Sequence, residues 1–309
     1  MNLNLAHVHI VINHIPSLGM VVAACLLVFS LLRKNDGLKK ISFQLLVAMS
    51  LMALPTFMSG SAAEAMLRNS SDATKGLIQE HENAAIWTLT LISITGTFAW
   101  FGLWQYRRFS RPGFGNTAIV VIFSLLTAAA ILRTANMGGD ITHMEIRTAG
   151  EVGIAADAGL QKHVENFTND HSWVWPAMET IHFIGMALLF GVALLVHMRM
   201  LGLMKSIPFA AVHRLMPMGI LGFALNVVSG MVFFLSNPPL YFLNPAFAAK
   251  ISCLLLAGIG VVYFTLFDTP WAVGAEQNAP LSSKIMAVTT MCMLLGVMYF
   301  GRILPFISH

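Results

Sequence analysis

Eight apolar stretches of about 20 residues each constrain this chain more than any other feature of its sequence. A stretch of this length crosses the hydrocarbon core of a bilayer as an α-helix, because only a helix pairs all of its backbone groups there. The whole chain is 57% hydrophobic and 10% charged, whereas soluble domains carry about 25% charged residues. We therefore predict an all-α integral membrane protein with about eight transmembrane helices. The stretches cover roughly residues 10–32, 42–63, 84–106, 116–136, 176–199, 214–236, 246–267 and 284–304.

The segments that join these stretches alternate in charge. One set holds 11 of the 18 Lys and Arg residues but only three of the 14 acidic residues, and it comprises residues 33–40, 106–111, 199–214 and 268–284. Basic loops stay in the cytoplasm according to the positive-inside rule. We therefore expect a bacterial-type inner membrane location with both termini outside. The chain start lacks a basic region and a cleavage site, so we interpret it as the first span.

The longest polar segment, residues 146–175, is acidic and is expected to be an outer loop. It separates two sets of four spans that do not resemble one another. We therefore predict two four-helix membrane bundles, residues 1–145 and 176–309.

Nine of the 11 histidines map to the predicted outer side. In the first bundle His9 and His14 begin the first span, His81 begins the third and His143 follows the fourth. Imidazoles presented at one depth by several helices are typical of a metal or haem site, since imidazole suits iron, copper and zinc. The alternative interpretation is that these histidines simply reach water at helix ends.

The second bundle offers His182, about two turns inside its first span. Glu179 lies three residues earlier and therefore faces the same way. Gly185, one turn deeper, would let a flat ring or a neighbouring helix approach. A b-type haem needs such a histidine from each of two helices, but a structural histidine bonded to a backbone carbonyl is an equal alternative. His197 and His213 flank a basic loop and are expected to be solvated.

The sequence lacks the motifs of several other kinds of site. Cys25, Cys253 and Cys292 all lie in apolar stretches without a C-x-x-C-H pattern, so the chain has neither a disulfide framework nor a covalent c-type haem site. No Walker motif, serine-hydrolase elbow or H-E-x-x-H is present.

Two stretches resemble known families. The pattern from His9 to Pro16, together with the segments around His81 and His143, resembles uncharacterised bacterial four-span membrane domains that begin H-x-x-x-N-H-x-P. The later pattern from Glu179 through residues 214–217 to 244–247 resembles a second uncharacterised four-span family, which is loosely similar to copper-resistance protein D and b-type cytochrome bundles. The resemblance implies a fusion of two four-helix bundles. His197 departs from it, because the second family carries an acidic residue there.

These observations favour a membrane redox protein that holds haem b, or another redox metal such as copper or iron, near the outer face. His14, His81 and His182, with Glu179 beside His182, are the predicted haem-binding residues, and His9 and His143 are further metal-ligand candidates. The acidic outer loop would dock a periplasmic electron carrier, and no feature indicates nucleic acid. Copper or iron transport and a cofactor-free scaffold in a complex with other membrane subunits are the alternatives.

Overall fold

The computed structural model describes residues 5–66, 72–142, 160–241 and 244–307, and within these ranges it contains helices and no β-strand. Within these described ranges, eight helices are long and apolar enough to cross a bilayer, which agrees with the predicted number and supports a multi-pass membrane protein. They correspond to Val8–Leu32, Asp36–Ser61, Lys75–Phe109, Phe114–Ile141, Val174–Leu201, Phe209–Ser236, Pro245–Leu266 and Leu281–Phe306.

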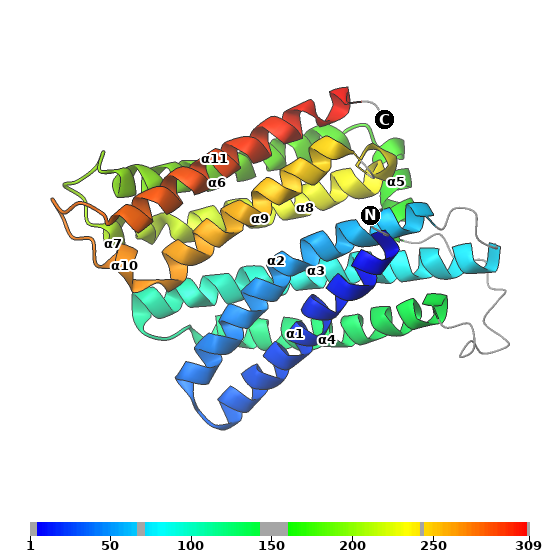
Figure 1. Ribbon diagram of the computed structural model, residues 1–309, viewed down its shortest axis with the longest axis horizontal. Coiled ribbons are helices and arrows are strands. Elements are labelled where there is room, and N and C mark those ends of the chain that lie inside the picture. The colour runs from blue at the N-terminus through cyan, green and yellow to red at the C-terminus, as the bar shows by residue number, and fades with distance from the viewer. Residues whose placement is uncertain (1–4, 67–71, 143–159, 242–243, 308–309) are drawn as a thin grey trace. The chain divides into compact units, whose positions relative to one another are not determined.

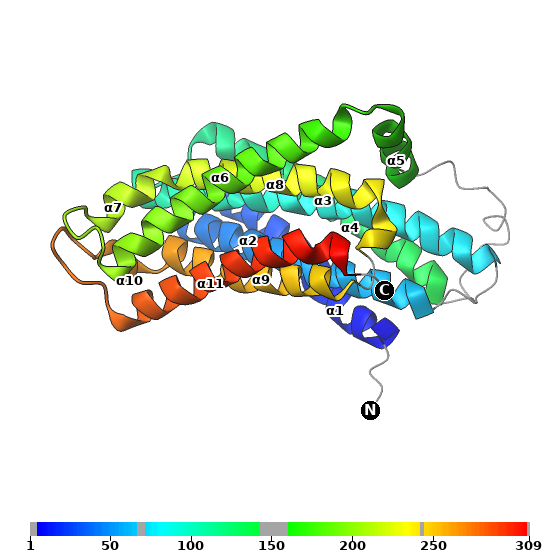
Figure 2. The ribbon, with the colours of Figure 1, turned by 90° about the horizontal axis from the view of Figure 1, so that it is seen from above.

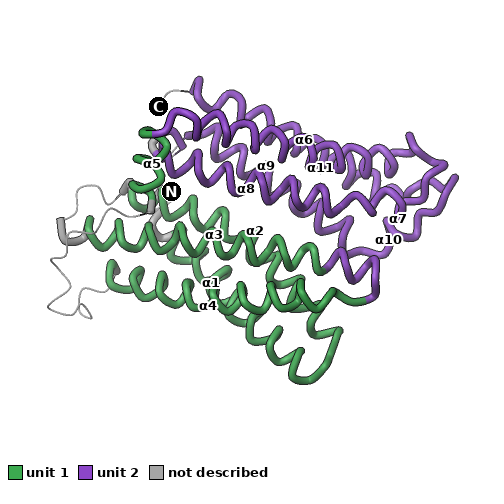
Figure 3. Tube along the Cα trace, turned by 180° about the vertical axis from the view of Figure 1, so that it is seen from behind, with its two compact units in different colours: residues 1–102, 111–170 green, residues 103–110, 171–309 purple. Residues whose placement is uncertain are grey.

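The chain forms two compact units, coloured separately in Figure 3. Unit 1 comprises residues 1–102 and 111–170, and unit 2 comprises residues 103–110 and 171–309. The last turns of the third long helix therefore belong to unit 2, although the rest of that helix belongs to unit 1.

Unit 1 contains four long helices and one short helix, labelled in Figure 1: α1 (Leu5–Leu32), α2 (Asp36–Met66), α3 (Asp72–Phe109), α4 (Phe114–Thr142) and α5 (Leu160–Asp170). α1 packs along α2 and also contacts α4. Small side chains allow close packing: a Cβ atom on Gly96 of α3 would lie 2.2 Å from Ser50 Oγ on α2. Ser50 Oγ donates to Ile92 O across the same contact (2.9 Å).

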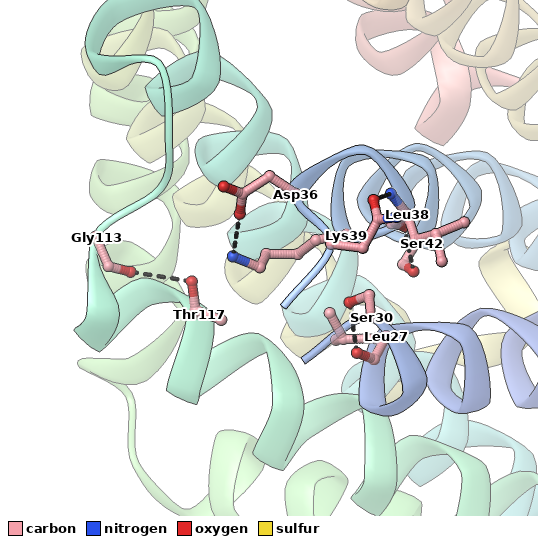
Figure 4. A network of polar contacts seen from close by, with 9 residues as sticks. Leu27, Ser30, Asp36, Leu38, Lys39, Ser42, Gly113 and Thr117 are labelled. Carbon is pink, nitrogen blue, oxygen red and sulfur yellow. Dashed lines mark hydrogen bonds and ion pairs between the residues drawn. The ribbon is translucent and has the colours of Figure 1, made fainter. Parts of the chain in front are cut away.

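Short-range polar contacts close the tight turn between α1 and α2 (Figure 4). Asn35 caps α2, since its Oδ1 accepts from Leu38 N (3.0 Å). In the first turn, Lys39 pairs with Asp36 (2.7 Å). Ser30 Oγ donates to Leu27 O (2.6 Å) near the end of α1, and Ser42 Oγ donates to Leu38 O (2.9 Å). These bonds occupy hydroxyl groups that would otherwise be unpaired among apolar side chains.

The segment expected to be an acidic outer loop contains a helix that we did not predict. Residues 160–170 form α5, with Thr168 buried and Lys162 paired with Glu165 (3.2 Å). α5 is short and amphipathic, and its sequence is mostly polar. Long apolar stretches predict spans but not a helix of this kind.

Unit 2 contains the end of α3 and the helices of the second half: α6 (Val174–Leu201), α7 (Phe209–Val212), α8 (Met216–Ser236), α9 (Pro245–Leu266), α10 (Asp268–Trp271) and α11 (Leu281–Ile303). Figure 2 shows α9 beside α11 and α6 beside α8, and both pairs are in contact. Gly185 on α6 faces Gly222 on α8 so closely that a Cβ atom on either would lie under 3.0 Å from the other's carbonyl oxygen. Small residues at such contacts let membrane helices approach closely.

Candidate functional site

The starts of α1 and α3 and the ends of α2 and α4 form one end of unit 1, which we name the histidine end. His9, on α1, lies against α2. Its Nδ1 is 3.2 Å from Thr56 O and 2.9 Å from Ser59 Oγ. Gly60 leaves room for the ring, because a Cβ atom there would lie 3.0 Å from His9 Cε1. The side chain is half-buried.

His81 repeats this arrangement between α3 and α4. Its Nδ1 is 3.0 Å from Thr134 O, and a Cβ atom on Gly138 would lie 3.1 Å from His81 Cε1. In both helix pairs, the second helix thus supplies a threonine carbonyl and, four residues later, a glycine. The two histidines occupy equivalent environments in the two helix pairs of unit 1.

The hydrogen-bond partners determine the tautomer of both rings. A carbonyl oxygen can only accept, so Nδ1 of His9 and of His81 must carry the proton. A neutral imidazole then has its lone pair on Nε2. Within the described residues, no hydrogen bond reaches either Nε2. Histidines that ligate metals through Nε2 usually donate Nδ1–H to a carbonyl or carboxylate in this way.

The two rings are close enough to interact electrostatically. The carboxylates of Glu64 on α2 and Glu82 on α3 also interact at this end. Among the described residues, no three His, Cys, Asp or Glu side chains are grouped closely enough to hold a metal ion. The site therefore consists of an imidazole pair with an acidic pair nearby.

The structure does not place His14 with these rings. His14 is exposed, and its Nδ1 bonds to Ile10 O of its own helix (2.7 Å). Five residues of helix rotate His14 by about 140° from His9, and α2 covers the His9 side. The prediction for His143 falls outside the described residues.

In unit 2, His182 contacts α8. Its Nδ1 lies 2.8 Å from Ser229 Oγ, and its ring lies 5.6 Å from the ring of Phe233. Ser229 Oγ donates its own hydrogen to Leu225 O (2.7 Å), so it must accept from His182 Nδ1–H. His182 therefore also has its lone pair on Nε2. Gly185 accommodates the backbone of α8 and not a flat ring.

Glu179 does not join His182. Its Oε1 accepts from Trp175 Nε1 (3.1 Å) on the exposed side of α6. The two side chains were expected to point the same way, but each has another partner. Trp175, one turn before Glu179, binds the carboxylate, and Ser229 binds the imidazole of His182. The structure thus gives no Glu179–His182 pair.

Lys250 is a site residue that the sequence analysis missed. It lies in the second turn of α9, within a candidate span, and a Cβ atom on Gly301 of α11 would lie 3.5 Å from its Nζ. Among the described residues it has no hydrogen bond or ion pair, and its one electrostatic partner is His182. A lysine inside a predicted span was the available sequence signal.

The opposite end of unit 2, which we name the arginine end, contradicts one expectation. His197 and His213 are 3% and 0% exposed, so they are not solvated. His197 packs against Phe264 (5.1 Å between centroids) and His213 against Trp271 (4.3 Å). His213 also packs against Phe209 of α7 (5.3 Å), whereas Phe264, the partner of His197, lies on α9. These are tertiary contacts that a charged loop sequence does not reveal.

Arg199 is also fully buried at the arginine end. Its Nε donates to Ile207 O, and its Nη2 donates to Gly274 O (2.7 Å) and Gln277 O (3.3 Å). Arg107, at the end of α3, pairs with Asp268 and bonds to Thr265 O (3.0 Å). Both arginines thus bind backbone carbonyls at the ends of helices and in loops, where carbonyls lack helical partners.

Comparisons of the chain with protein-family models, curated proteins and solved structures found no significant match.

Proposed function

We propose that unit 1 is a membrane electron-transfer module in which His9 and His81 would hold a b-type haem. One observation carries the proposal. Two imidazoles from different helix pairs each donate Nδ1–H to a backbone carbonyl and keep the Nε2 lone pair uncommitted. A non-covalent haem needs two such ligands from two helices of a bundle.

The chain's own residues would orient the ligands. Thr56 O with Ser59 Oγ, and Thr134 O, fix the tautomer and the rotation of each ring. Such hydrogen bonds also raise the basicity of the ligating nitrogen. Gly60 and Gly138 allow each ring to lie against the neighbouring helix. A bound haem would supply one-electron redox chemistry, and half-burial of the imidazoles would limit water at the iron.

The sequence supports an orientation for this module. Basic residues concentrate in the loops at the other ends of the helices, so the positive-inside rule favours a histidine end at the outer face of a bacterial-type inner membrane. The acidic segment between the halves would then lie outside, where it suits the docking of a basic soluble electron carrier. His14 is left out of the ligand set because its ring is exposed.

An optical spectrum of the purified full chain tests the proposal. We expect a b-type band in the reduced-minus-oxidised difference spectrum, and its loss in His9→Ala and in His81→Ala. His14→Ala is the matched control, because it removes an imidazole from the same helix as His9, and it should keep the band. Equal spectra for all three variants would overturn the assignment, and so would a protein from haem-supplied cells without any band.

A second candidate function is the handling of a copper or iron ion at the same end. The carboxylates of Glu64 and Glu82, which interact with each other at the same end of unit 1, favour it, because acidic groups attract cations. Metal analysis of the same sample separates the two candidates. A stoichiometric metal without a haem band, lost in His81→Ala, would support metal handling over electron transfer.

A further inference from the structure

The unpaired cation of unit 2 points to a binding site distinct from the imidazole pair of unit 1. We propose that Lys250 and His182 bind the headgroup of an anionic phospholipid that also carries hydroxyl groups, such as phosphatidylglycerol. The site lies at the end of unit 2 where α6 and α9 begin and where α8 and α11 end.

Lys250 supplies the charge. An ammonium group within a membrane span is costly unless it is paired, and such residues are functional candidates for that reason. Among the described residues Lys250 has neither a hydrogen bond nor an ion pair. The first turn of α9 has no acidic residue, and the start of a helix itself bears partial positive charge. Asn244 Oδ1 already accepts from the N–H groups of Ala246 and Phe247, so the charge available to a ligand is that of Lys250. A cation without an acidic partner among the described residues favours an oxyanion as the ligand.

His182 supplies an acceptor beside that charge. Ser229 holds its Nδ1–H, so Nε2 offers only a lone pair. An oxyanion cannot donate to this nitrogen, but a hydroxyl on the same headgroup can. The two side chains are within electrostatic range of each other. Together they complement a ligand that has both a phosphate and a hydroxyl donor.

The depth of the site favours a lipid as the source of the phosphate. Both residues lie inside candidate spans and near one end of their helices, Lys250 in the second turn of α9 and His182 about two turns from the start of α6. This depth is close to where headgroups meet acyl chains. Phe183 and Ile184, which follow His182, are exposed large apolar side chains suited to contact with acyl chains. Lys250 is not fully enclosed, and the proposal requires that a headgroup reach it from the bilayer.

The site also differs from the proposed haem site in its chemistry. The prediction that His182 binds haem stays a prediction. A haem iron would occupy the same Nε2 atom that the lipid hydroxyl would use. A cation is the electrostatic neighbour of His182, whereas another imidazole is the neighbour of His9. Loss of the haem band in His182→Ala would therefore count against the lipid assignment.

Native mass spectrometry of the full chain, reconstituted with phosphatidylcholine and a minor fraction of phosphatidylglycerol, tests the proposal. We expect Lys250→Met to retain phosphatidylglycerol about fivefold less than the wild type, since one lysine contributes about that factor to anionic-lipid binding. Lys250→Arg should retain it. Lys284→Met, in a different helix of unit 2, is the control. If Lys250→Met does not fold, Lys250→Gln is measured in its place.

Two further arms identify the ligand. Phosphatidylmethanol has the same charge without headgroup hydroxyls, so the wild type should prefer phosphatidylglycerol and His182→Ala should lose that preference. Soluble glycerol phosphate should not displace the lipid. Unchanged retention in Lys250→Met, equal retention of both lipids by the wild type, or displacement by glycerol phosphate would each overturn the proposal.

Discussion

Replacing Gly222 with alanine tests how closely α6 and α8 must approach. The added Cβ atom would lie 2.6 Å from Gly185 O and 2.7 Å from Leu189 N. Both are backbone atoms of α6, so no side-chain rotation can relieve the contact. The two helices must therefore separate, and the His182–Ser229 hydrogen bond (2.8 Å) crosses the same interface.

Two opposing terms set the magnitude. Overpacking a close contact costs about 1–3 kcal/mol, while alanine in place of glycine stabilises a helix by about 1 kcal/mol. We therefore expect Gly222→Ala to lower the free energy of unfolding by up to about 2 kcal/mol. An opening of roughly 0.5 Å would also take the His182–Ser229 bond beyond its normal range.

Gly230→Ala is the matched control on the same helix. A Cβ atom on Gly230 meets nothing within 4 Å, so only the helix-propensity term applies and the variant should be as stable as the wild type or more stable. The assay is equilibrium unfolding in mixed micelles, followed by tryptophan fluorescence. Equal stability of the two variants would refute the claim that backbone contact at Gly222 limits the packing of α6 on α8.

Two further predictions concern single side chains of unit 2. Ser229→Ala removes the acceptor of His182 Nδ1–H and should cost about 1 kcal/mol in the same unfolding assay; Ser252→Ala, at an exposed position, should be neutral. Burial raises the pKa of Tyr241 from 10.0 to about 12. The folded protein therefore keeps this proton while the unfolded chain loses it, so stability present below pH 10 should fall by about 1.4 kcal/mol per pH unit between pH 10 and 12. Tyr241→Phe should reduce this loss of stability above pH 10. If the variant loses as much stability between pH 10 and 12 as the wild type, Tyr241 is not its source.

Hydropathy predicted the spans but not where the helices end. The third span was expected at about residues 84–106, whereas α3 runs from Asp72 to Phe109. Lys75 and Glu80 continue the helix although neither belongs in hydrocarbon. Hydropathy locates the part of a helix that suits the bilayer core, while backbone hydrogen bonding and capping determine its ends.

The candidate site was predictable in residue type but not in geometry. The sequence identified His9, His14 and His81 as candidates, and the structure gives only His9 and His81 a contact with a neighbouring helix. Which side of α1 is covered depends on how α2 packs, which the sequence of α1 does not contain. The two threonine carbonyl acceptors were not predictable either, because every residue has a backbone carbonyl and the residue type does not show which one a histidine will bind.

The uncommitted polar atoms of the arginine end differ in their surroundings from those of His9, His81 and Lys250. Arg199 Nη1 and His197 Nε2 are enclosed without a partner at the arginine end. The carbonyls that Arg199 binds belong to two separate loops, at Ile207 and at residues 274–277, so its guanidinium ties both loops to α6 and has a structural role without any ligand. His9, His81 and Lys250 hold no loop in place and are only half-buried. The two proposals for these residues rest on this difference, because an uncommitted nitrogen that is not enclosed by the protein is open to a ligand.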